Sequence, residues 1–384
     1  MEARGSVLVV FGTRPEAIKL APVIEALRAR VPVRVCVTAQ HRTMLDQVLR
    51  VFQLRPDIDL DLMKPDQDLY DVTSAGVVAL RDVMRNEKPR MVVVQGDTTT
   101  TFVAALAAFY AHVEVAHVEA GLRTYDKRRP FPEEINRRLT TVLADWHFAP
   151  TPWARENLLR EGISPERICV TGNTGVDALL DVARRLDQGE LQVELPAELA
   201  SQLRGRKLVL VTGHRRESFG AGFERICRAL RTLVESEPDV VVVYPVHLNP
   251  RVREPVFRLL GEQPRIVLLE PLEYLPFVAL MRRADVILTD SGGIQEEAPS
   301  LAKPVLVMRD KTERPEGVEA GVAKLVGTDP ERIVGAVRTL LHDAAAYQAM
   351  TAQQNPYGDG RAAARIASVI EQVIAGKPPA PVPV

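Results

Sequence analysis

Short runs of β-branched residues alternate with helix-length amphipathic segments along most of the chain, and this alternation restricts the possible folds most strongly. A continuous apolar strand must be covered on both faces, so the pattern predicts parallel sheets with helices on either side. The runs, six in each half, are Val7–Phe11, Val33–Val37, Met91–Val94, Val113–His117, Trp146–Ala149, Ile168–Thr171, Leu208–Thr212, Val240–Tyr244, Ile266–Leu269, Val286–Thr289, Val305–Met308 and Lys324–Val326. They predict an α/β protein with two doubly wound, Rossmann-like domains.

The domain boundary is expected where this alternation is interrupted. A chain of 384 residues suits two hydrophobic cores better than one. Between Thr171 and Arg206, a helix near Asp177–Leu186 gives way to a polar, proline-interrupted segment. We therefore expect an N-terminal domain over residues 1–172 and a second domain over 173–360. A helix over 361–375 and a proline-rich tail over 376–384 complete the chain.

Composition and charge exclude several classes of protein. The formal net charge of −1 gives no basic footprint for nucleic acid. The sequence has neither a signal peptide nor an apolar run long enough to span a membrane. The cysteines Cys36, Cys169 and Cys227 lie far apart and lack zinc-site spacing, which favours reduced thiols in the cytosol. We expect a cytoplasmic protein that binds neither nucleic acid nor membrane.

Polar clusters follow the predicted strands directly. In open α/β sheets, ligands bind beyond the carboxyl ends of the strands. Two domains whose polar strand ends face each other would enclose a central cleft, so we interpret the chain as a cleft enzyme. The clusters are Gly12–Glu16, Thr38–Arg42, Gly96–Thr100, Val118–Arg123, Thr212–Ser218 and Tyr244–His247.

The segment Thr289–Glu297 follows a predicted buried strand and begins a helix. Ser291, Gly292 and Gly293 carry little side-chain bulk, so N–H groups at the helix start can approach an anion. Glu296 and Glu297 in the first turn can accept hydrogen bonds from ligand hydroxyls, and together these features suggest a nucleoside diphosphate. The alternative is a tight strand-to-helix turn in which the acidic residues complement the helix dipole. The motif alone leaves both interpretations open.

Four carboxylates lie close to strand ends or helix starts in the first half of the chain. Asp97 is a candidate catalytic acid or only an N-cap residue. Glu119 follows its strand so closely that capping explains it less well. Glu133 and Glu134 both begin a helix, where the helix dipole accounts for at least one of them. The spacing favours Glu133 as the residue that faces the cleft.

Basic residues near strand ends are candidate anion ligands. Arg14 and Lys19 flank the start of the first helix, and both can reach an anion there or form a solvated basic face. His214 lies between a glycine and paired arginines at a strand end, a position suited to an anion contact. His247 is a candidate ligand of a second site or a capping group. The sequence contains no P-loop, HExxH motif or G-x-S-x-G elbow, and this favours nucleotide-sugar chemistry in a two-domain cleft.

Taken together, six motifs closely resemble those of the non-hydrolysing UDP-N-acetylglucosamine 2-epimerases, in order, over about residues 5–375. These motifs are FGTRPEAIK (11–19), TAQHR (38–42), GDTTTT (96–101), HVEAGLR (117–123), TGHRRE (212–217) and DSGGIQEE (290–297). The resemblance implies the glycosyltransferase-B architecture, with the C-terminal helix crossing back to the first domain. It also implies a cytoplasmic homodimer that interconverts UDP-N-acetylglucosamine and UDP-N-acetylmannosamine without NAD, another cofactor or an obligatory metal.

The resemblance further implies roles for individual residues. Ser291, Gly292 and Gly293 are expected to hold the diphosphate, Glu297 the ribose hydroxyls, and Phe277 is expected to lie by the uracil. The phosphates are expected to be surrounded by Arg14, Lys19, His214 and Arg314. The expected catalytic residues are Asp97, Glu119, Glu133 and His214. A second, activating UDP-N-acetylglucosamine site is expected to involve Gln40, His41, Gln67, Arg215 and His247.

The implied reaction removes and returns a proton at C2 of the sugar while UDP leaves and rejoins C1. Inversion at C2 requires acid/base groups on both faces, which fits several carboxylates better than one.

Three alternative functions have different signatures. A hydrolysing epimerase releases free N-acetylmannosamine and UDP, a glycosyltransferase on the same fold requires an acceptor, and a nucleotide-sugar sensor binds without turnover.

Overall fold

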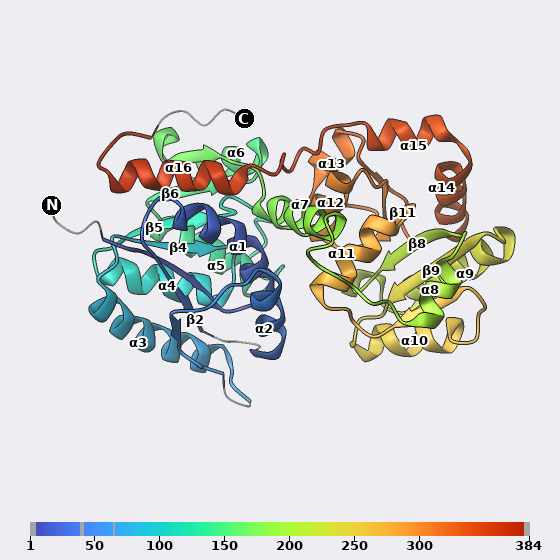
Figure 1. Ribbon diagram of the computed structural model, residues 1–384, viewed down its shortest axis with the longest axis horizontal. Coiled ribbons are helices and arrows are strands. Elements are labelled where there is room, and N and C mark those ends of the chain that lie inside the picture. Colours follow the sequence, from blue (N-terminus) through green and yellow to red (C-terminus); the bar gives the residue numbers. More distant parts are fainter. Residues whose placement is uncertain (1–4, 39–41, 64–65, 380–384) are drawn as a thin grey trace. The chain divides into compact units, whose positions relative to one another are not determined.

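The computed structural model describes residues 5–38, 42–63 and 66–379. The chain divides into two compact units, unit 1 (Met1–Ala178 and Gly358–Val384) and unit 2 (Leu179–Tyr357), and each is described by itself (Figure 1). The first division lies inside helix α7 (Thr174–Asp187), not at residue 172. The start of α7 belongs to unit 1 because the Asp177 carboxylate accepts hydrogen bonds from the N–H groups of Ala362 (3.3 Å) and Ala363 (2.8 Å) in that unit.

Unit 1 contains a parallel seven-stranded sheet in the order β3-β2-β1-β4-β5-β6-β7. Its strands are β1 (Val7–Phe11), β2 (Val33–Val37), β3 (Ile58–Asp59), β4 (Met91–Gln95), β5 (Glu114–Val118), β6 (Trp146–Ala149) and β7 (Ile168–Val170). Its helices are α1 (Arg14–Arg28), α2 (Arg42–Val51), α3 (Leu69–Glu87), α4 (Thr99–Tyr110), α5 (Glu133–Leu143), α6 (Pro152–Arg160), the start of α7, and α16 (Ala362–Ile374).

Unit 2 contains a parallel six-stranded sheet in the order β10-β9-β8-β11-β12-β13. Its strands are β8 (Lys207–Thr212), β9 (Val240–Pro245), β10 (Ile266–Leu269), β11 (Val286–Thr289), β12 (Val305–Val307) and β13 (Ala323–Leu325). The remaining helices are α8 (Ala197–Leu203), α9 (Ala221–Ser236), α10 (Pro250–Leu260), α11 (Tyr274–Arg283), α12 (Gly292–Glu297), α13 (Pro315–Glu319), α14 (Pro330–His342) and α15 (Ala344–Thr351).

Every run predicted as a strand is a strand, with ends displaced by at most one residue, and the α/β fold class is confirmed. The central strands β1 and β4 are buried along their whole length, as expected for a sheet covered on both faces. Complete burial of each such Val or Leu side chain contributes roughly 1.5–3 kcal/mol. The two-residue strand β3 carries no apolar run and was not expected.

Each sheet reverses its strand order at one point, between β1 and β4 in unit 1 and between β8 and β11 in unit 2. Loops after the two strands that flank such a switch point diverge to opposite faces of the sheet, which leaves room for a ligand at their carboxyl ends. The motifs after β1, β4, β8 and β11 are therefore placed where an α/β protein binds its ligands.

The C-terminal helix α16 belongs to unit 1, where it packs along α1 (Figure 1). Its apolar side, which includes Ile366, Val369 and Ile370, is buried. An ion pair of 2.7 Å joins Glu371 to Arg30, at the end of α1. The last helix of the chain thus completes the unit that the first helix begins.

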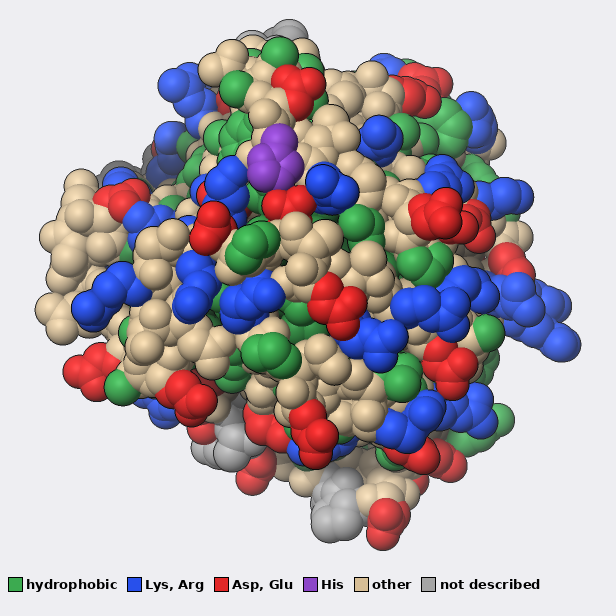
Figure 2. Space-filling model, turned by 90° about the vertical axis from the view of Figure 1, so that its right-hand side faces the viewer, with side chains coloured by type: hydrophobic (Ala, Val, Ile, Leu, Met, Phe, Trp, Pro, Cys, Tyr) green, Lys and Arg blue, Asp and Glu red, His purple; other side chains and the backbone are tan. Residues whose placement is uncertain are grey.

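The surface carries charges of both signs. The face drawn in Figure 2 shows Lys and Arg side chains interspersed with Asp and Glu. In the part of the chain that the structure describes, no helix is both long and apolar enough to cross a membrane.

Candidate active site

The loops after β1, β2 and β4 pack tightly together in unit 1. The hydroxyls of Thr38 and Thr100 lie 3.0 Å apart, and a Cβ atom added to Gly12 would clash with both. Glycine at position 12 is therefore required by the close approach of the loops. This packing fixes the start of α1 beside the start of α4.

The buried carboxylate of Glu16 holds the same loops together. One oxygen accepts hydrogen bonds from the N–H groups of Gly12 (3.1 Å) and Thr13 (2.7 Å). The other accepts from the hydroxyls of Thr98 (2.7 Å) and Thr101 (3.1 Å). Burial raises the pKa of Glu16 despite these bonds. All four partners belong to the protein, so Glu16 organises the site.

Glu119 lies immediately after β5 and adopts a left-handed backbone conformation, with φ of +64°. Its carboxylate receives both bonds from one ammonium group, since Lys19 Nζ lies 2.7 Å from Oε1 and 2.6 Å from Oε2. Gln95, the last residue of β4, donates an amide hydrogen bond to the same carboxylate. A non-glycine residue at positive φ is strained, and such strain is concentrated at functional sites.

Asp97 is not the N-cap of α4, because Thr98 occupies that position and accepts from the N–H of Thr101 (3.1 Å). The Asp97 carboxylate lies 2.6 Å from Nη2 of Arg137, and its side chain is 28% exposed. Burial raises the pKa of Asp97, with Arg137 opposing this effect and Glu119 and Glu133 reinforcing it. The mutual influence of these charges places Asp97, Glu119 and Glu133 in one electrostatic cluster.

The neighbouring residues Glu133 and Glu134 have different environments. Glu134 is fully buried and accepts hydrogen bonds from the N–H groups of Thr124 and Tyr125, both at 3.0 Å. Within the described residues, the buried Oε2 of Glu133 has no hydrogen-bond partner. Glu134 therefore has a structural task, while Glu133 remains available for chemistry.

A buried histidine supports the loop that carries Asp97. His117 Nε2 lies 2.7 Å from the carbonyl oxygen of Gly96. Burial lowers the pKa of His117 to about 4 and that of His147, its register partner on β6, to about 3. Both rings are therefore neutral near pH 7, and the Nε2–H of His117 donates to Gly96.

In unit 2, Asp290 organises the loop that follows β8. Its buried carboxylate accepts from the N–H groups of His214 and Arg215, both at 2.8 Å, and lies 3.2 Å from the His214 ring. Although burial opposes ionisation, His214 and the two N–H donors lower the pKa of Asp290. The His214 ring is 38% exposed and stacks on His247 at a centroid distance of 5.5 Å. His214 is thus oriented by an anion and accessible to a ligand.

The turn Ser291-Gly292-Gly293 begins α12 directly after β11. The N–H of Ser291 donates to the hydroxyl of Thr289 (3.0 Å), so it is already used. A Cβ added to Gly292 would lie 3.0 Å from Cζ of Arg314, whereas one added to Gly293 would meet nothing within 4 Å. An arginine therefore lies over Gly292, and the space beside Gly293 is open. This arrangement is suited to an anion.

Arg314 is held by two carboxylates. Its Nε donates to Oε1 of the buried Glu296 at 2.7 Å, and Nη1 lies 3.4 Å from Glu313. Glu313 also pairs with Arg215 (3.1 Å) and Arg309, and these arginines lower its pKa to about 2. Glu296, interpreted above as a possible acceptor for ligand hydroxyls, is instead committed to Arg314. Its neighbour Glu297 is partly buried.

The other expected ligands are distributed over both units. Phe277 lies on α11 and is partly buried. Arg14 begins α1 and is partly buried, and no ionic partner is recorded for it among the described residues. Of the expected activator residues, Arg215 and His247 lie next to His214 in unit 2, whereas Gln67 lies in unit 1. Gln40 and His41 lie outside the residues that the structure describes.

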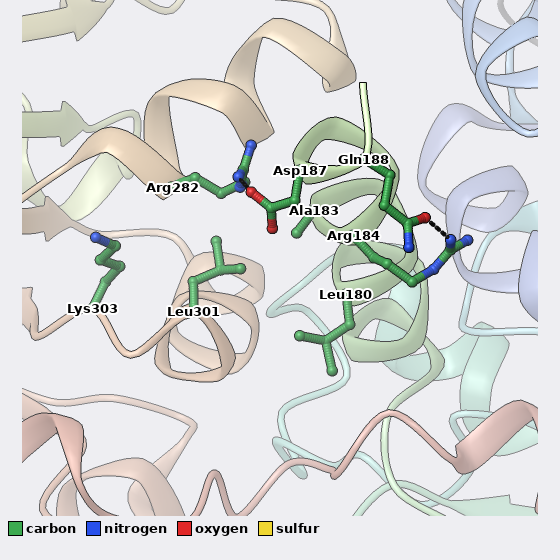
Figure 3. A pocket seen from close by; sticks show the side chains of 8 residues that line it. All are labelled: Leu180, Ala183, Arg184, Asp187, Gln188, Arg282, Leu301 and Lys303. Atoms are coloured by element: carbon green, nitrogen blue, oxygen red, sulfur yellow. Dashed lines mark hydrogen bonds and ion pairs between the residues drawn. The ribbon is translucent and has the colours of Figure 1, made fainter. Parts of the chain in front are cut away.

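A cavity of about 490 Å³ in unit 2 does not involve these residues (Figure 3). Its lining is Leu180, Ala183, Arg184, Asp187, Gln188, Arg282, Leu301 and Lys303. Two polar contacts, Arg282 with Asp187 and Arg184 with Gln188, connect lining side chains to each other. The charges of this cavity are thus largely satisfied within the protein.

Three important residues of unit 1 were not found from the sequence: Gln95, Asn136 and Arg137. Gln95 ends an apolar strand, a position that carried a usable signal because a polar residue there must face the ligand edge. Arg137 follows Glu133 by one helical turn, which places both on the same side of α5. Nothing in the sequence indicates that this arginine pairs with Asp97.

Within the described ranges, no group of three or more His, Cys, Asp or Glu side chains is arranged to hold a metal ion.

Two doubly wound α/β units, each with polar loops at its switch point, define the class of two-domain enzymes with the glycosyltransferase-B architecture. Residues 25–371 match the sequence model of the family UDP-N-acetylglucosamine 2-epimerase. The chain belongs to this UDP-N-acetylglucosamine 2-epimerase family.

Individual relatives cover almost the whole chain. UDP-N-acetylglucosamine 2-epimerase of Escherichia coli (strain K12) is 56% identical over 369 residues, which cover 95% of this chain and 98% of that protein. The structure of UDP-GlcNAc 2-epimerase from Neisseria meningitidis bound to UDP-GlcNAc is similar with a TM-score of 0.85 and 47% identity, covering 96% of this chain and 100% of the other. The S. aureus MnaA–UDP co-structure is similar with a TM-score of 0.86 and 46% identity, covering 99% of this chain and 100% of the other.

Proposed function

We propose that the chain is an isomerase that interconverts UDP-N-acetylglucosamine and UDP-N-acetylmannosamine by reversible inversion at C2, without hydrolysis of the nucleotide sugar. The observation that carries the proposal is the group of three carboxylates Asp97, Glu119 and Glu133 in unit 1, two of which, Asp97 and Glu119, are each paired with a separate cation. Family membership supplies the substrate class.

In this proposal, unit 2 binds the UDP portion. The N–H groups at Gly292 and Gly293, the guanidinium of Arg314 and the His214 ring contact the diphosphate. Glu297 accepts hydrogen bonds from the ribose, and Phe277 lies by the uracil. Cations and oriented N–H groups stabilise the negative charge that develops on UDP as the C1–O bond breaks.

Unit 1 supplies the proton chemistry. Departure of UDP places positive charge on the sugar ring and acidifies the C2–H bond, so that a carboxylate can remove this proton. The resulting 2-acetamidoglucal is reprotonated at C2 on the opposite face, and UDP returns to C1. Asp97 and Glu119 form the acid/base pair, and Glu133 supports them. Burial raises the pKa of Asp97 above its ordinary value, and perturbed pKa values are common among groups that transfer protons.

One experiment tests this function. The chain is incubated with UDP-N-acetylglucosamine in deuterated water, and products are followed by NMR. We expect UDP-N-acetylmannosamine with deuterium at C2, and we expect Asp97→Asn to lose at least about 100-fold of this exchange. Asp126→Asn, at an exposed loop position, serves as the control.

Each alternative product would overturn the proposal in its own way. Free N-acetylmannosamine and UDP would identify a hydrolysing epimerase. Turnover only after addition of a sugar acceptor would identify a glycosyltransferase. Saturable binding with no turnover would identify a sensor. Full exchange by Asp97→Asn would remove that residue from the mechanism.

We also propose that Arg215 and His247 of unit 2 belong to a regulatory site for a second UDP-N-acetylglucosamine molecule. The proposal is supported by the stacking of His247 on His214, because a ligand contact at either ring would be felt by the other. UDP-N-acetylglucosamine should accelerate the reverse reaction in the wild type but not in His247→Ala. Equal acceleration in both proteins would contradict the proposal.

A homodimer is proposed through the outer side of α4 and α5 in unit 1. These helices contact each other and expose apolar side chains, among them Phe109 (57% exposed), Tyr110 (66%) and Val142 (80%). Exposed apolar side chains of this kind are typical of a protein interface. Light scattering should give a dimer mass for the wild type and a monomer mass for Val142→Glu, with Leu248→Glu, at an exposed apolar position of unit 2, as control. A monomeric wild type would refute this interface.

We propose a cytoplasmic location. Burial raises the pKa values of the free thiols Cys36 and Cys227 to about 12 and that of Cys169 to about 11, as expected for unreactive structural cysteines. Fractionation of cells that express the chain would test the location, and recovery outside the cytoplasmic fraction would contradict it.

A further inference from the structure

Helix α5 holds Asp97 at two points. The side-chain amide of Asn136 donates to the Asp97 carbonyl oxygen at 3.1 Å. The next residue, Arg137, donates from Nη2 to the Asp97 carboxylate at 2.6 Å. Adjacent residues of one helix therefore fix both the backbone and the side chain of the aspartate.

The guanidinium of Arg137 is itself held in place. Its side chain is 11% exposed, and Nη1 lies 3.6 Å from the fully buried carboxylate of Glu134. Glu134 is in turn bonded to the backbone of the 124–125 loop. A guanidinium with so little freedom can hold a carboxylate in one orientation, and a charge-assisted bond in a partly desolvated site is stronger than one in water.

The charges that face Asp97 oppose one another. Glu119, at the end of β5, and Glu133, at the start of α5, disfavour its negative charge, as does burial. Arg137 from α5 and Lys19 from α1 favour the negative charge, and Arg137 has the larger effect of the two. Lys19 forms an ion pair with Glu119, and Arg137 is bonded directly to the Asp97 carboxylate.

We propose that Arg137 is a positioning residue that keeps Asp97 ionised and correctly oriented for proton transfer at C2, an inference that rests on the proposed epimerase function. It acts through Asp97 and does not itself exchange a proton. Without Arg137, burial and the neighbouring carboxylates would leave Asp97 protonated over a wider range of pH, and its side chain would be free to rotate.

The test compares three substitutions with a control on the same helix. Arg137→Met removes the charge, Arg137→Gln keeps a hydrogen-bond donor without charge, and Arg137→Lys keeps the charge without the planar fork. Arg138→Met is the control, because Arg138 is 48% exposed and its contact is with Glu161 at 3.8 Å. Circular dichroism identifies any variant that does not fold, and the remaining variants then decide the outcome.

Two readouts are needed. The first is the titration of the Asp97 carboxyl carbon by NMR, assigned by its loss in Asp97→Asn. The second is the pH dependence of kcat and kcat/KM. We expect Arg137→Met and Arg137→Gln to move the Asp97 titration and the acidic limb of the kcat profile upward by about one pH unit or more, since the lost pair lies at 2.6 Å. At pH 7, kcat of these two variants should be about 100-fold below that of the wild type, while KM changes less than about threefold. The kcat of Arg137→Lys should be about tenfold higher than theirs.

The outcomes separate this inference from the proposed function. An unchanged Asp97 titration in both charge-removing variants would overturn the role of Arg137, whether or not the wild type turns over. A wild type that does not epimerise would refute the proposed function and the catalytic part of this inference, while the titration would still decide on the electrostatic part. A loss of kcat in Arg138→Met equal to that in Arg137→Met would show a general effect of α5 and would also overturn the inference.

Discussion

Lys19 Nζ lies 2.7 Å and 2.6 Å from the two carboxylate oxygens of Glu119, although the residues are 100 positions apart in the chain. Their side chains are 17% and 7% exposed. Water therefore screens this ion pair little. In the described structure, Lys19 thus holds an acid of unit 1, a contact that its expected role at the phosphates did not include.

Removal of Lys19 should affect both stability and catalysis. In Lys19→Met, the Glu119 carboxylate keeps its Gln95 contact but loses its cation, and a buried charge that loses its partner costs about 3 kcal/mol. We expect a decrease of this order in the free energy of unfolding, measured with urea, and a fall of at least about 100-fold in kcat/KM. Arg28→Met, an exposed change in the last turn of the same helix, should leave both unchanged. Wild-type turnover by Lys19→Met would contradict a catalytic Glu119 that depends on this pair.

The two glycines of α12 should respond differently to alanine. In Gly293→Ala, the added methyl group contacts nothing in the protein, so the melting temperature should equal that of the wild type. If phosphate occupies the open space, UDP should bind this variant about tenfold more weakly. Gly292→Ala presses on Arg314 and should lower both UDP affinity and melting temperature. Calorimetry measures both quantities. Unchanged UDP affinity in Gly293→Ala would place the diphosphate elsewhere.

Glu313 should contribute to stability in a pH-dependent way. Three arginines lower its folded pKa to about 2 from the ordinary value of 4.5, so its stabilising effect is complete above about pH 4.5 and is lost as the pH falls towards 2. The difference in unfolding free energy between wild type and Glu313→Gln should therefore be largest near pH 6–7 and shrink below pH 4.5. Glu331→Gln, exposed on α14, is the matched control. A difference that does not vary with pH would show that the arginines do not stabilise the ionised form.

His117 should also make the stability of the protein sensitive to acid, but for a different reason: burial disfavours its protonated form. Because its folded pKa is about 4 and its ordinary value 6.5, the unfolded chain binds this proton first as the pH falls. Stability should decrease between pH 6.5 and 4, and His117 should account for about 2–3 kcal/mol of that loss. Urea titrations of His117→Asn should show a shallower decrease over this interval. His112→Asn, in an exposed turn, should retain the wild-type slope, and the same slope in His117→Asn would refute this origin.

The sequence predicted the sheets well because their signal is local. A continuous apolar run such as Val7–Phe11 indicates a buried strand without reference to the rest of the chain. The polar residues that follow the strands also predict a ligand edge. Strand β3 carried no such run, since its two residues pair at the edge of the sheet.

The partners of the candidate site residues could not be read in the same way. The pairs Lys19–Glu119 and Arg137–Asp97 join segments that are distant in sequence, so only the three-dimensional packing identifies them. Glu296 and Glu297 are adjacent and chemically equivalent, and nothing in the sequence shows that Glu296 forms a 2.7 Å bond with Arg314. Likewise, the sequence did not decide whether Asp97 or the next residue caps helix α4. The structure shows Thr98 at the N-cap position. Types and positions of residues were predictable, whereas their pairing was not.

The return of α16 to unit 1 has a consequence for synthesis of the chain. Helix α16 packs along α1 and is synthesised after the whole of unit 2. Unit 2 is one continuous stretch and can complete its core while translation continues, whereas the first unit to be started is the last to be finished. A nascent chain stalled before residue 362 therefore lacks the helix that covers part of α1, and synthesis of α16 completes this packing.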